Sequence, residues 1–483
     1  MSFSASSSSS DELLYMRGVQ ASQAGNFATA VVWLAQAAQA QPSRGDIAYN
    51  YGVALQKTGN LPQAIEVWEK AVTLSPEHSV IWANLALAYR LSRQEEQARQ
   101  IYERGLQQHP ENRDLLYPYA LLLTRLGEQA QSLALFQKLT ERNPADSAAW
   151  INAGKAAKEL GQWQTAEKAY DTAIALGGPN EPHARFNRAN LRLSLGNWEQ
   201  GFADYEARRQ LADAVPIPWD LPNATRALPS GSTLLLWSDQ GIGDALMFLR
   251  FIPQVTALGY RPSLFVQSAL KQLLTGHPFV EATYDPHDVP CQKMDAALAL
   301  GSLPFFLHIS PETSWEGPYI SPAAPFTLPP STDKKKIGLV WAGNPKHEND
   351  RNRSLSFAEL APLWSLSNIQ WLSLQHGPQA KNIPADAPLR NMTEHLTDFS
   401  VTAAILQDLD LLITADTAMA HLAGAMGVPV WVLLPATGTD WRWGRNGETS
   451  FWYPSMRLFR QNPGESWAGP LQRIVSELKK TGF

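Results

Sequence analysis

Side chains with the chemistry for catalysis or anion binding are concentrated in three short segments of the second half of this 483-residue chain. The first segment is SDQGIGDALMFLRF, in which Asp244 follows Gly241 and Gly243. A positioned carboxylate can remove a proton from an acceptor hydroxyl, so Asp244 is a candidate general base and Asp239 a reserve candidate. Two alternatives stay open. The glycines could form a nicotinamide-dinucleotide fingerprint, although Leu246 replaces its third glycine, and Asp244 could merely favour the dipole of the helix that it begins.

The second segment, NPKHENDRNRS, combines cations with small polar residues directly after an apolar run. Arginine offers bidentate geometry to a phosphate and lysine a point charge, so this loop is predicted to bind a diphosphate. The candidate ligands are Asn344, Lys346, Arg353 and Ser354. The alternative is a solvated polar loop in which Glu348 and Asp350 partly neutralise the cations.

The third segment, DLLITADTAMAHLAGAMGVPVWVLLP from Asp410, is typical of a strand, a helix and a second strand. Asp416 and Thr417 stand where the helix would begin, and free N–H groups at such a position suit a phosphate. Ala418 follows them, and His421 lies one turn further along the same helix face. His421 is predicted to lie near the anion site, with a buried structural role as the alternative.

Two other groups of residues are weaker candidates. Asp408-Leu409-Asp410 imitates an acidic metal-binding pair but directly precedes a buried strand, and no His/Cys cluster has metal-ligand spacing, so no metal site is expected. The segment DWRWGRNGE carries aromatic and guanidinium groups that could stack on a base or a sugar, or could simply pack a long loop. These residues are Trp441, Arg442, Trp443 and Arg445.

The elements around these segments alternate between apolar strands and helices, which predicts parallel sheets. We expect strands near residues 234–237, 264–266, 296–300, 337–343, 371–375, 411–413 and 430–434. We expect helices from about Asp244 and over 357–364, 401–407, 418–425 and 470–480. Ligands bind outside the carboxyl ends of strands in such sheets. The first two candidate segments begin at such an end, and Asp416 of the third segment follows its strand.

The first half of the chain has a period of 34 residues. Prolines recur at Pro42, Pro76, Pro110 and Pro144. Glycines recur with the same spacing at Gly25, Gly59, Gly127 and Gly161, and Arg93 takes the equivalent position in the remaining repeat. Bulky side chains follow at the same spacing. This pattern resembles tetratricopeptide repeats, about six of them, stacked into a solenoid with a concave surface for a protein partner.

Changes in composition and proline-rich stretches set the predicted domain boundaries. These are a disordered tail over 1–10, a repeat array over 11–212, a proline-rich linker over 213–231, and two α/β domains over 232–320 and 321–483. The formal net charge of −5 gives no bulk attraction to nucleic acid. No apolar run approaches the ~20 residues of a membrane span. The lone Cys291 and the lack of a secretory signal favour a cytoplasmic protein.

The segments ITADTAMAHLAGAMGVPV and SDQGIGDALMFLRF resemble the donor-site and N-terminal segments of the heptosyltransferase-like glycosyltransferases, a family of GT-B fold. Joined to a repeat array, they are similar in layout to bacterial repeat-linked protein glycosyltransferases, including those that modify flagellin. The resemblance implies an N-terminal α-solenoid followed by a GT-B pair of Rossmann-like domains.

The resemblance also implies roles for particular residues. Asp244 would be the general base, Asp416 and Thr417 would contact the donor's sugar or phosphates, and Lys346 or Arg353 would serve the diphosphate. Ala418 replaces the family's glycine after the Asp-Thr pair, and Gln375 is our candidate for recognising the base. The implied reaction is an inverting, metal-independent sugar transfer from a nucleotide sugar to a serine or threonine of a protein, with no cofactor. The alternatives are an inactive transferase-like domain on a protein-binding scaffold, and an enzyme that acts on a lipopolysaccharide sugar.

Overall fold

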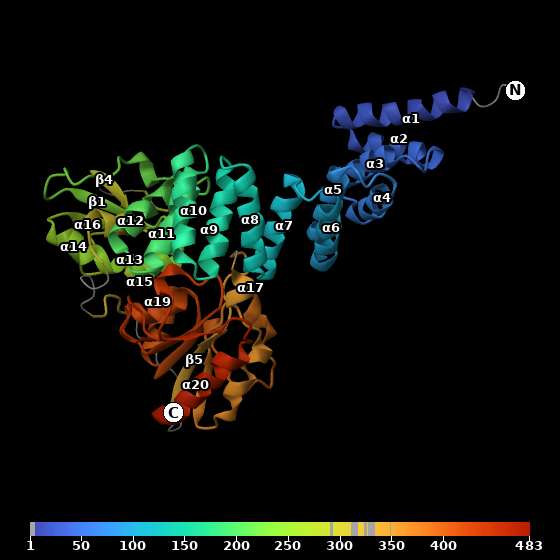
Figure 1. Ribbon diagram of the computed structural model, residues 1–483. Helices are drawn as coiled ribbons and strands as arrows, with labels where there is room; N and C mark the ends of the chain where they lie inside the picture. The colour runs from blue at the N-terminus through green and yellow to red at the C-terminus, as the bar shows by residue number, and fades with distance from the viewer. Residues whose placement is uncertain (1–4, 290–292, 311–316, 323–325, 327–333, 348) are drawn as a thin grey trace. The chain divides into compact units, whose positions relative to one another are not determined.

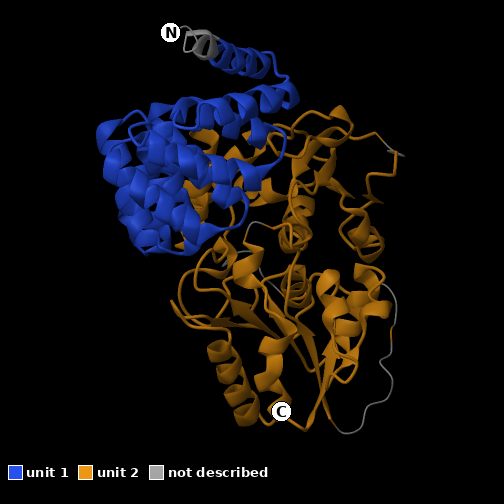
Figure 2. Cartoon of the chain, turned by 90° about the vertical axis from the view of Figure 1, so that its right-hand side faces the viewer, with its two compact units in different colours: residues 1–180 blue, residues 181–483 orange. Residues whose placement is uncertain are grey.

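The computed structural model describes residues 5–289, 293–310, 317–322, 326, 334–347 and 349–483, with side chains from Ser10 onward. The chain forms two compact units, Met1–Asn180 and Glu181–Phe483 (Figure 2). The expected boundary between array and linker lay further along, at residue 212. Cys291 and most of residues 310–333, around the expected boundary between the two α/β domains, lie outside the described residues.

The first unit consists of helices in consecutive pairs (Figure 1). Their bounds are α1 Ala5–Gln23, α2 Phe27–Ala40, α3 Gly45–Lys57, α4 Leu61–Leu74, α5 Ser79–Leu91, α6 Glu95–Gln108, α7 Arg113–Leu126, α8 Gln129–Arg142, α9 Ser147–Glu159 and α10 Trp163–Leu176. Helix α1 begins at Ala5, so the predicted disordered tail is wrong for residues 5–10, while residues 1–4 lie outside the described part.

The 34-residue period has a backbone cause. The glycine phase marks the turn between the two helices of a repeat, where Gly25, Gly59, Gly127 and Gly161 have φ between 72° and 85°. Such a φ favours glycine because no Cβ clashes. Arg93 fills the same position with a φ of 59°, so its repeat keeps the turn at a conformational cost.

Small and bulky residues alternate between facing helices of a repeat. A Cβ on Gly52 would lie 2.3 Å from the indole nitrogen of Trp68, and one on Gly154 would lie 2.5 Å from the ring of Tyr170. Trp68 and Tyr170 are themselves fully buried. The solenoid core is therefore built from the residues that give the sequence its period.

The second unit begins with one further helix pair, α11 Glu181–Ser194 and α12 Trp198–Tyr205, which is followed by the 3₁₀ turn η1 Glu206–Gln210. Leu193, Phe202 and Tyr205 belong to the same buried cluster as Leu234 and Leu246 of the α/β region. The last repeat is thus built into the core of the second unit, although its sequence belongs to the array.

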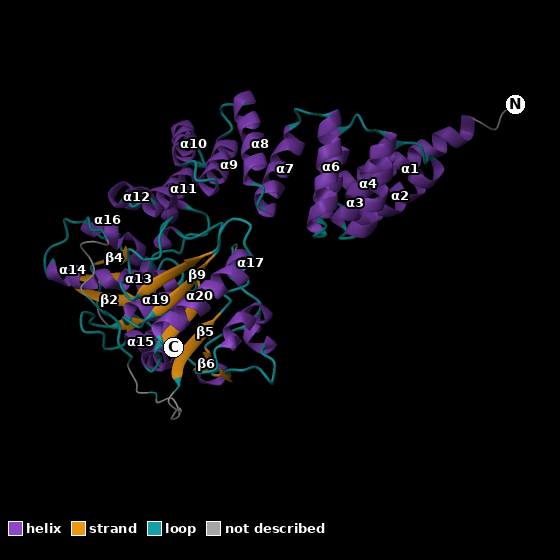
Figure 3. Ribbon diagram, turned by 60° about the horizontal axis from the view of Figure 1, so that its bottom comes forward, coloured by secondary structure: helices purple, strands orange, loops and turns teal. Residues whose placement is uncertain are grey.

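Two parallel sheets follow this helix pair, shown as strands in Figure 3. The first has the order β3-β2-β1-β4, with β1 Thr233–Trp237, β2 Arg261–Phe265, β3 Thr283–Tyr284 and β4 Ala296–Ala299. The second has the order β10-β9-β8-β5-β6-β7, with β5 Lys335–Val340, β6 Ile369–Ser373, β7 Arg390–Asn391, β8 Leu411–Ala415, β9 Val430–Leu434 and β10 Met456–Arg460. In each sheet the chain first adds strands on one side of the first strand, β1 or β5, and then continues on its other side. The edge of the first strand where this change occurs is the topological switch point, at which α/β sheets bind ligands.

Helices cover these sheets and connect their strands. In the first sheet region they are α13 Ile242–Phe248, α14 Ile252–Ala257, α15 Ser268–Leu274 and α16 Leu303–Leu307. In the second they are α17 Asp350–Arg353, α18 Phe399–Gln407, α19 Ala418–Ala425 and α20 Ala468–Thr481. The expected strands and helices are present, but β3, β7 and β10 were not predicted. Residues 357–365 form a 3₁₀ helix, η6, which contains Pro362.

The proline-rich linker packs on the first sheet. Trp219 meets the rings of Phe265 and Tyr284 edge-on, each at a centroid distance of 5.2 Å. The backbone N–H of Ala224 donates to the carbonyl of Ala297 in β4 at 2.8 Å. The linker is therefore ordered by contacts with this sheet.

Candidate functional site

A pocket of about 890 Å³ lies between the two sheets of the second unit. Its lining comes from the glycine turn before α13, from the loops after β5, β6 and β8, and from the loop after β9. Of the predicted site residues, those that line it are Gly241, Gly243, Asp244, Asn344, Arg353, Gln375, Asp416, Thr417, Ala418 and His421. Lys346 and Ser354 do not.

Asp244 projects into this pocket from the first turn of α13. One carboxylate oxygen, Oδ2, accepts a hydrogen bond from the Gly241 backbone N–H at 2.9 Å, and Oδ1 forms an ion pair with Arg442. The side chain is 26% exposed. Burial raises the pKa of Asp244 above its ordinary value, although the Arg442 guanidinium opposes this shift. Asp244 therefore combines access to the pocket with a basicity above that of a free carboxylate.

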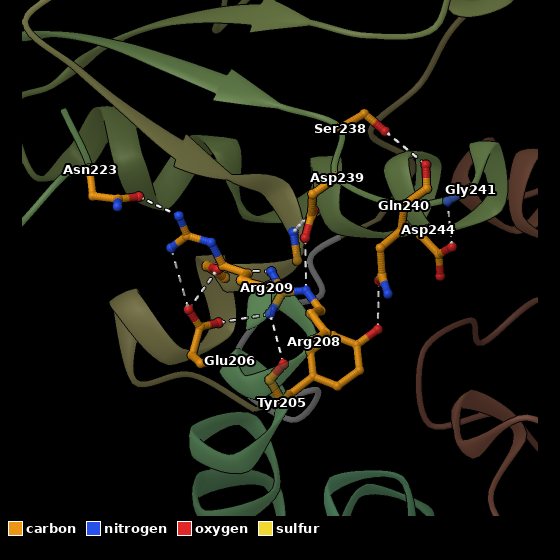
Figure 4. Close-up of polar contacts among 12 residues, drawn as sticks. Tyr205, Glu206, Arg208, Arg209, Asn223, Ser238, Asp239, Gln240, Gly241 and Asp244 are labelled. Carbon is orange, nitrogen blue, oxygen red and sulfur yellow. Dashed lines mark hydrogen bonds and ion pairs between the residues drawn. The ribbon is translucent and has the colours of Figure 1, made fainter. Parts of the chain in front are cut away.

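Asp239 is not available as the reserve base. Its Oδ2 accepts from the buried Arg208 at 2.7 Å, and its Oδ1 accepts from the backbone N–H of Gly301 at 3.2 Å (Figure 4). It does not line the pocket. Both oxygens are committed to contacts that hold the glycine turn against η1 and the end of β4.

Gly241 and Gly243 serve different purposes. Gly243 lies at the contact between α13 and α19, where an added Cβ would stand 2.8 Å from the imidazole of His421 and 3.5 Å from Ala418 Cα. Gly241 is the N-cap of α13. The two sheet regions approach each other closely at Gly243, and this explains the second glycine without a dinucleotide.

Asp416 and Thr417 follow β8 at the switch point of the second sheet. Thr417 caps α19, its Oγ1 accepting from the Met419 N–H at 3.3 Å. Burial raises the pKa of Asp416 to about 6, with a further rise from nearby Asp440 and an opposing effect of Arg353. The N-terminus of α19 thus faces the pocket beside a carboxyl group whose pKa is raised by burial.

Arg353 is the cation that the second segment brings to the pocket. Its Nη1 donates to the carbonyl of Asp416 at 3.0 Å, and its Nε lies 3.5 Å from Asp350 Oδ1. Ser354 closes the loop instead of facing the pocket: its Oγ accepts from the Gly343 N–H and donates to Asp350. The loop is built around a buried Asp350, so the alternative of a wholly solvated loop is wrong for its second half.

Lys346 occupies the exposed first half of that loop. Its backbone N–H donates to Asn344 Oδ1 at 3.0 Å, which forms a tight turn. The side chain is exposed and lies outside the pocket lining. Of the two cations proposed for the diphosphate, only Arg353 reaches the pocket in this structure.

Gln375 has no hydrogen-bonding capacity left to recognise a base. Its Oε1 accepts from the N–H groups of Trp341 and Ala342, and its Nε2 donates to the carbonyls of Ala342 and His376. All four distances lie between 2.9 and 3.0 Å, and the residue is 1% exposed. An amide offers two donors and accepts at one oxygen, so the side chain is fully used in joining the ends of β5 and β6.

His421 is buried, and its structural alternative is supported. Its Nδ1 lies 2.9 Å from the hydroxyl of Tyr453, and its ring stacks on Trp443 at a centroid distance of 4.9 Å. Burial, with a contribution from Arg442, lowers the pKa of His421 to about 3. The imidazole is therefore neutral at physiological pH and contacts the pocket as an uncharged wall.

Arg442 is the site residue whose role the sequence did not predict. Its guanidinium contacts Asp244 from the first sheet region and both oxygens of Asp440, at 2.9 and 3.1 Å. It lies over the Trp441 ring at 4.2 Å and is 4% exposed. The only available signal was a cation in a loop after a strand. Its partner Asp244 is remote in sequence, and no local pattern reports such a contact.

The other weak candidates have structural roles. Trp441 and Trp443 are buried and absent from the pocket lining, so they pack the loop. Arg445 Nε donates to Ser194 at 3.2 Å. Asp408 and Asp410 pair with Lys336 and Lys335 at the amino ends of β5 and β8, away from the pocket. Among the described residues no group of three or more His, Cys, Asp or Glu could hold a metal ion.

Family models described as tetratricopeptide repeat match residues 15–79, 92–157 and 151–214. The N-terminal array consists of tetratricopeptide repeats. Protein FlbA of Caulobacter vibrioides is 25% identical over 405 residues, which cover 74% of this chain and 65% of FlbA. The aligned chain thus spans less than two thirds of that relative's length.

Three solved structures illustrate the similarity. A tetratricopeptide repeat protein from Parabacteroides merdae is 23% identical, with a TM-score of 0.37 over 41% of this chain and 78% of its own. PilF of Pseudomonas aeruginosa is 18% identical, with a TM-score of 0.36 over 43% and 94%. YrrB, described as a TPR protein with an unusual peptide-binding site, is 19% identical, with a TM-score of 0.33 over 37% and 91%.

No helix within the described residues is long and apolar enough to cross a membrane.

Proposed function

We propose that this protein is an inverting, metal-independent glycosyltransferase of GT-B organisation. It would transfer a sugar from a nucleotide donor to a serine or threonine of a protein that the repeat array binds, with flagellin as one candidate acceptor. The observation that carries the proposal is the pocket between two parallel sheets, with Asp244 on one wall and Arg353 beside the α19 N-terminus on the other.

The two walls divide the proposed reaction between them. A helix N-terminus and an arginine favour the negative charge that develops on a departing nucleoside diphosphate. A carboxylate on the opposite wall removes the proton of the acceptor hydroxyl as the new bond forms. The proposal requires no metal or cofactor, because this chain's own groups supply both charge stabilisation and proton transfer.

The Gln375 side chain is committed to the fold, so another group must recognise the nucleotide base. His376 and Gly377, in the loop after β6, line the pocket. We propose that the nucleotide base is bound there, since backbone donors and acceptors can pair with the edge of a base.

A protein-interaction scaffold with an inactive transferase-like domain is the second candidate. It is favoured by the repeat array and by Asp244, whose two oxygens are both engaged in this structure. Release of nucleoside diphosphate from a panel of nucleotide sugars, together with the intact mass of co-expressed acceptor proteins, separates the two. Donor binding without release or mass change would favour the scaffold. Transfer to a lipopolysaccharide sugar, with no change in the mass of any protein, would favour an enzyme that acts on lipopolysaccharide.

The decisive variant is Asp244→Asn. Asparagine cannot take the proton, so we expect turnover to fall at least about a hundredfold with donor affinity retained. Asparagine has only one acceptor oxygen, whereas Asp244 accepts from both Gly241 and Arg442, so the stability loss should reach about 1–3 kcal/mol. Calorimetric unfolding of the same preparation separates this loss from the chemical effect. Turnover at the wild-type rate would remove Asp244 from the proposed role.

A further inference from the structure

The last helix of the repeat array contacts the residues that hold Asp244. Tyr205, at the end of α12, donates its hydroxyl to Gln240 Oε1 at 2.6 Å, and Gln240 belongs to the glycine turn (Figure 4). The same hydroxyl accepts from Arg442 Nη2 at 3.3 Å. One buried hydroxyl thus joins the turn that carries the proposed base to the arginine that pairs with it.

The ring of Tyr205 is fixed independently of its hydroxyl. It packs edge-on against Phe202 and Trp441 at centroid distances of 6.4 and 5.8 Å, and Arg208 lies over it at 4.7 Å. Burial raises the pKa of Tyr205, so the hydroxyl keeps its proton. A protonated hydroxyl has one donor and accepts at its oxygen, and here both functions are used at defined positions.

Arg442 is shared between the two sides of the pocket. It pairs with Asp244 on α13 and with Asp440 in the loop after β9. A buried guanidinium held by two carboxylates and a hydroxyl has little freedom, because leaving any of these groups unpaired is unfavourable. Arg442 and the Gly241 backbone N–H each hold one oxygen of Asp244, so together they fix the orientation of its carboxylate.

We propose that Tyr205 and Arg442 are positioning residues for the proposed general base. The Tyr205 hydroxyl fixes the glycine turn and Arg442, and Arg442 orients the Asp244 carboxylate toward the pocket. This inference rests on the proposed function. It assigns the last repeat a role in the reaction in addition to binding an acceptor, since the array's final helix supplies a group that acts on the base through its neighbours.

The proposal predicts the direction of a change in pH dependence. Arg442 stabilises the ionised form of Asp244, so its neutralisation raises the pKa of Asp244 and moves the acidic limb of the rate profile to higher pH. Asp440 acts in the opposite sense, so its neutralisation moves the limb to lower pH. Arg442, Asp440 and Asp239 act on the charge of Asp244, and Tyr205 interacts with it as well. Arg208 lies against Tyr205, and His421 lies against Gly243 of α13.

The test compares pH–rate profiles of the full chain and single variants. Tyr205→Phe removes only the hydroxyl and should lower kcat about fivefold with an unchanged donor KM. Arg442→Gln should lower kcat further and shift the acidic limb upward by about one unit, while Arg442→Lys restores part of the loss. Tyr260→Phe is the matched control, because it removes a hydroxyl bonded to Leu228 at 3.3 Å outside the pocket lining.

A second readout does not depend on sugar transfer. The carboxyl ¹³C shift of Asp244, assigned by its loss in Asp244→Asn, reports the pKa of Asp244 directly. We expect the pKa to be higher in Arg442→Gln and in Tyr205→Phe than in the wild type and in Tyr260→Phe. A wild type without transferase activity would overturn the proposed function alone, whereas unchanged kcat and an unchanged Asp244 titration in Tyr205→Phe would overturn the positioning role.

Discussion

The carboxyl group of Asp416 combines a contribution to the site with a cost to stability. Burial raises the pKa of Asp416 to about 6, above the ordinary value of an unfolded aspartate. The folded state therefore binds more protons than the unfolded state between about pH 4 and 6, and the free energy of unfolding falls as the pH rises through that window. Near pH 7 the charged carboxylate is held in a site that disfavours it.

We expect Asp416→Asn to raise the free energy of unfolding at pH 7 by about 1–3 kcal/mol, because the amide never carries that charge. At pH 4 and below, where the wild-type group is protonated in the folded state, the gain should disappear. Denaturant unfolding at both pH values measures the difference, with the exposed Asp386→Asn as control. A gain that is equal at both pH values would show that charge burial is not its cause. Turnover should fall in the same variant, since residues that destabilise a fold are often the ones that its function requires.

The elements around the pocket distinguish two cations that the sequence could not. Arg353 is held at the end of α17 by a loop folded around Asp350, whereas Lys346 belongs to the exposed turn that precedes it. Both cations follow β5 in one polar segment, so neither composition nor spacing indicates which of them reaches the pocket.

We therefore expect Arg353→Ala to weaken donor binding about tenfold to a hundredfold, as the loss of a charge-assisted hydrogen bond would. Lys346→Ala should change donor affinity by less than about twofold, because an exposed lysine outside the pocket contributes little. Isothermal titration with the nucleotide diphosphate measures both. A larger loss in Lys346→Ala than in Arg353→Ala would mean that the loop rearranges to bring the lysine to the donor.

The turn of the third repeat is conformationally strained at one residue. Arg93 has a φ of 59° in a slot that Gly25, Gly59, Gly127 and Gly161 fill elsewhere. Arg93→Gly should raise the free energy of unfolding of the array by about 0.5–1 kcal/mol, as relief of left-handed strain outweighs the added backbone entropy of glycine. Arg93→Ala is the control, since it removes the same side chain without relieving the backbone. Equal stability in both variants would argue against strain at this turn.

A feature of this protein could be predicted from the sequence where the residues that determine it lie close together in the chain. Repeat turns and the strands and helices around α19 were predictable because Gly, Pro and apolar spacing act within a few residues. Gln375 and Arg442 were not, because their roles are set by contacts between segments distant in sequence. β10 was missed because Arg457 interrupts its apolar residues and Arg460 ends it. The side chains of both arginines bond to groups outside the strand.

At the scale of the whole molecule, the boundary of the second unit at Glu181 has an energetic basis. Arg208 and Asp239 form a buried ion pair between η1 and the glycine turn, and Phe202 and Tyr205 belong to the buried cluster of the α/β region. Cutting the chain at the predicted linker would remove one partner of the pair and both aromatic rings. Loss of one partner costs about 3–5 kcal/mol, and a buried aromatic side chain costs about as much again.

These costs together approach or exceed the typical stability of a domain, about 5–15 kcal/mol. We therefore expect a fragment of residues 181–483 to unfold cooperatively and to bind the nucleotide sugar as the full chain does, and a fragment of residues 213–483 to lack a cooperative transition. Circular dichroism melts and donor titrations compare the two fragments. If the shorter fragment folds and binds donor normally, the last repeat is dispensable for the α/β region. The longer fragment should fail to modify a protein acceptor, because it lacks helices α1–α10 of the array; full transfer by it would place the acceptor site outside those repeats.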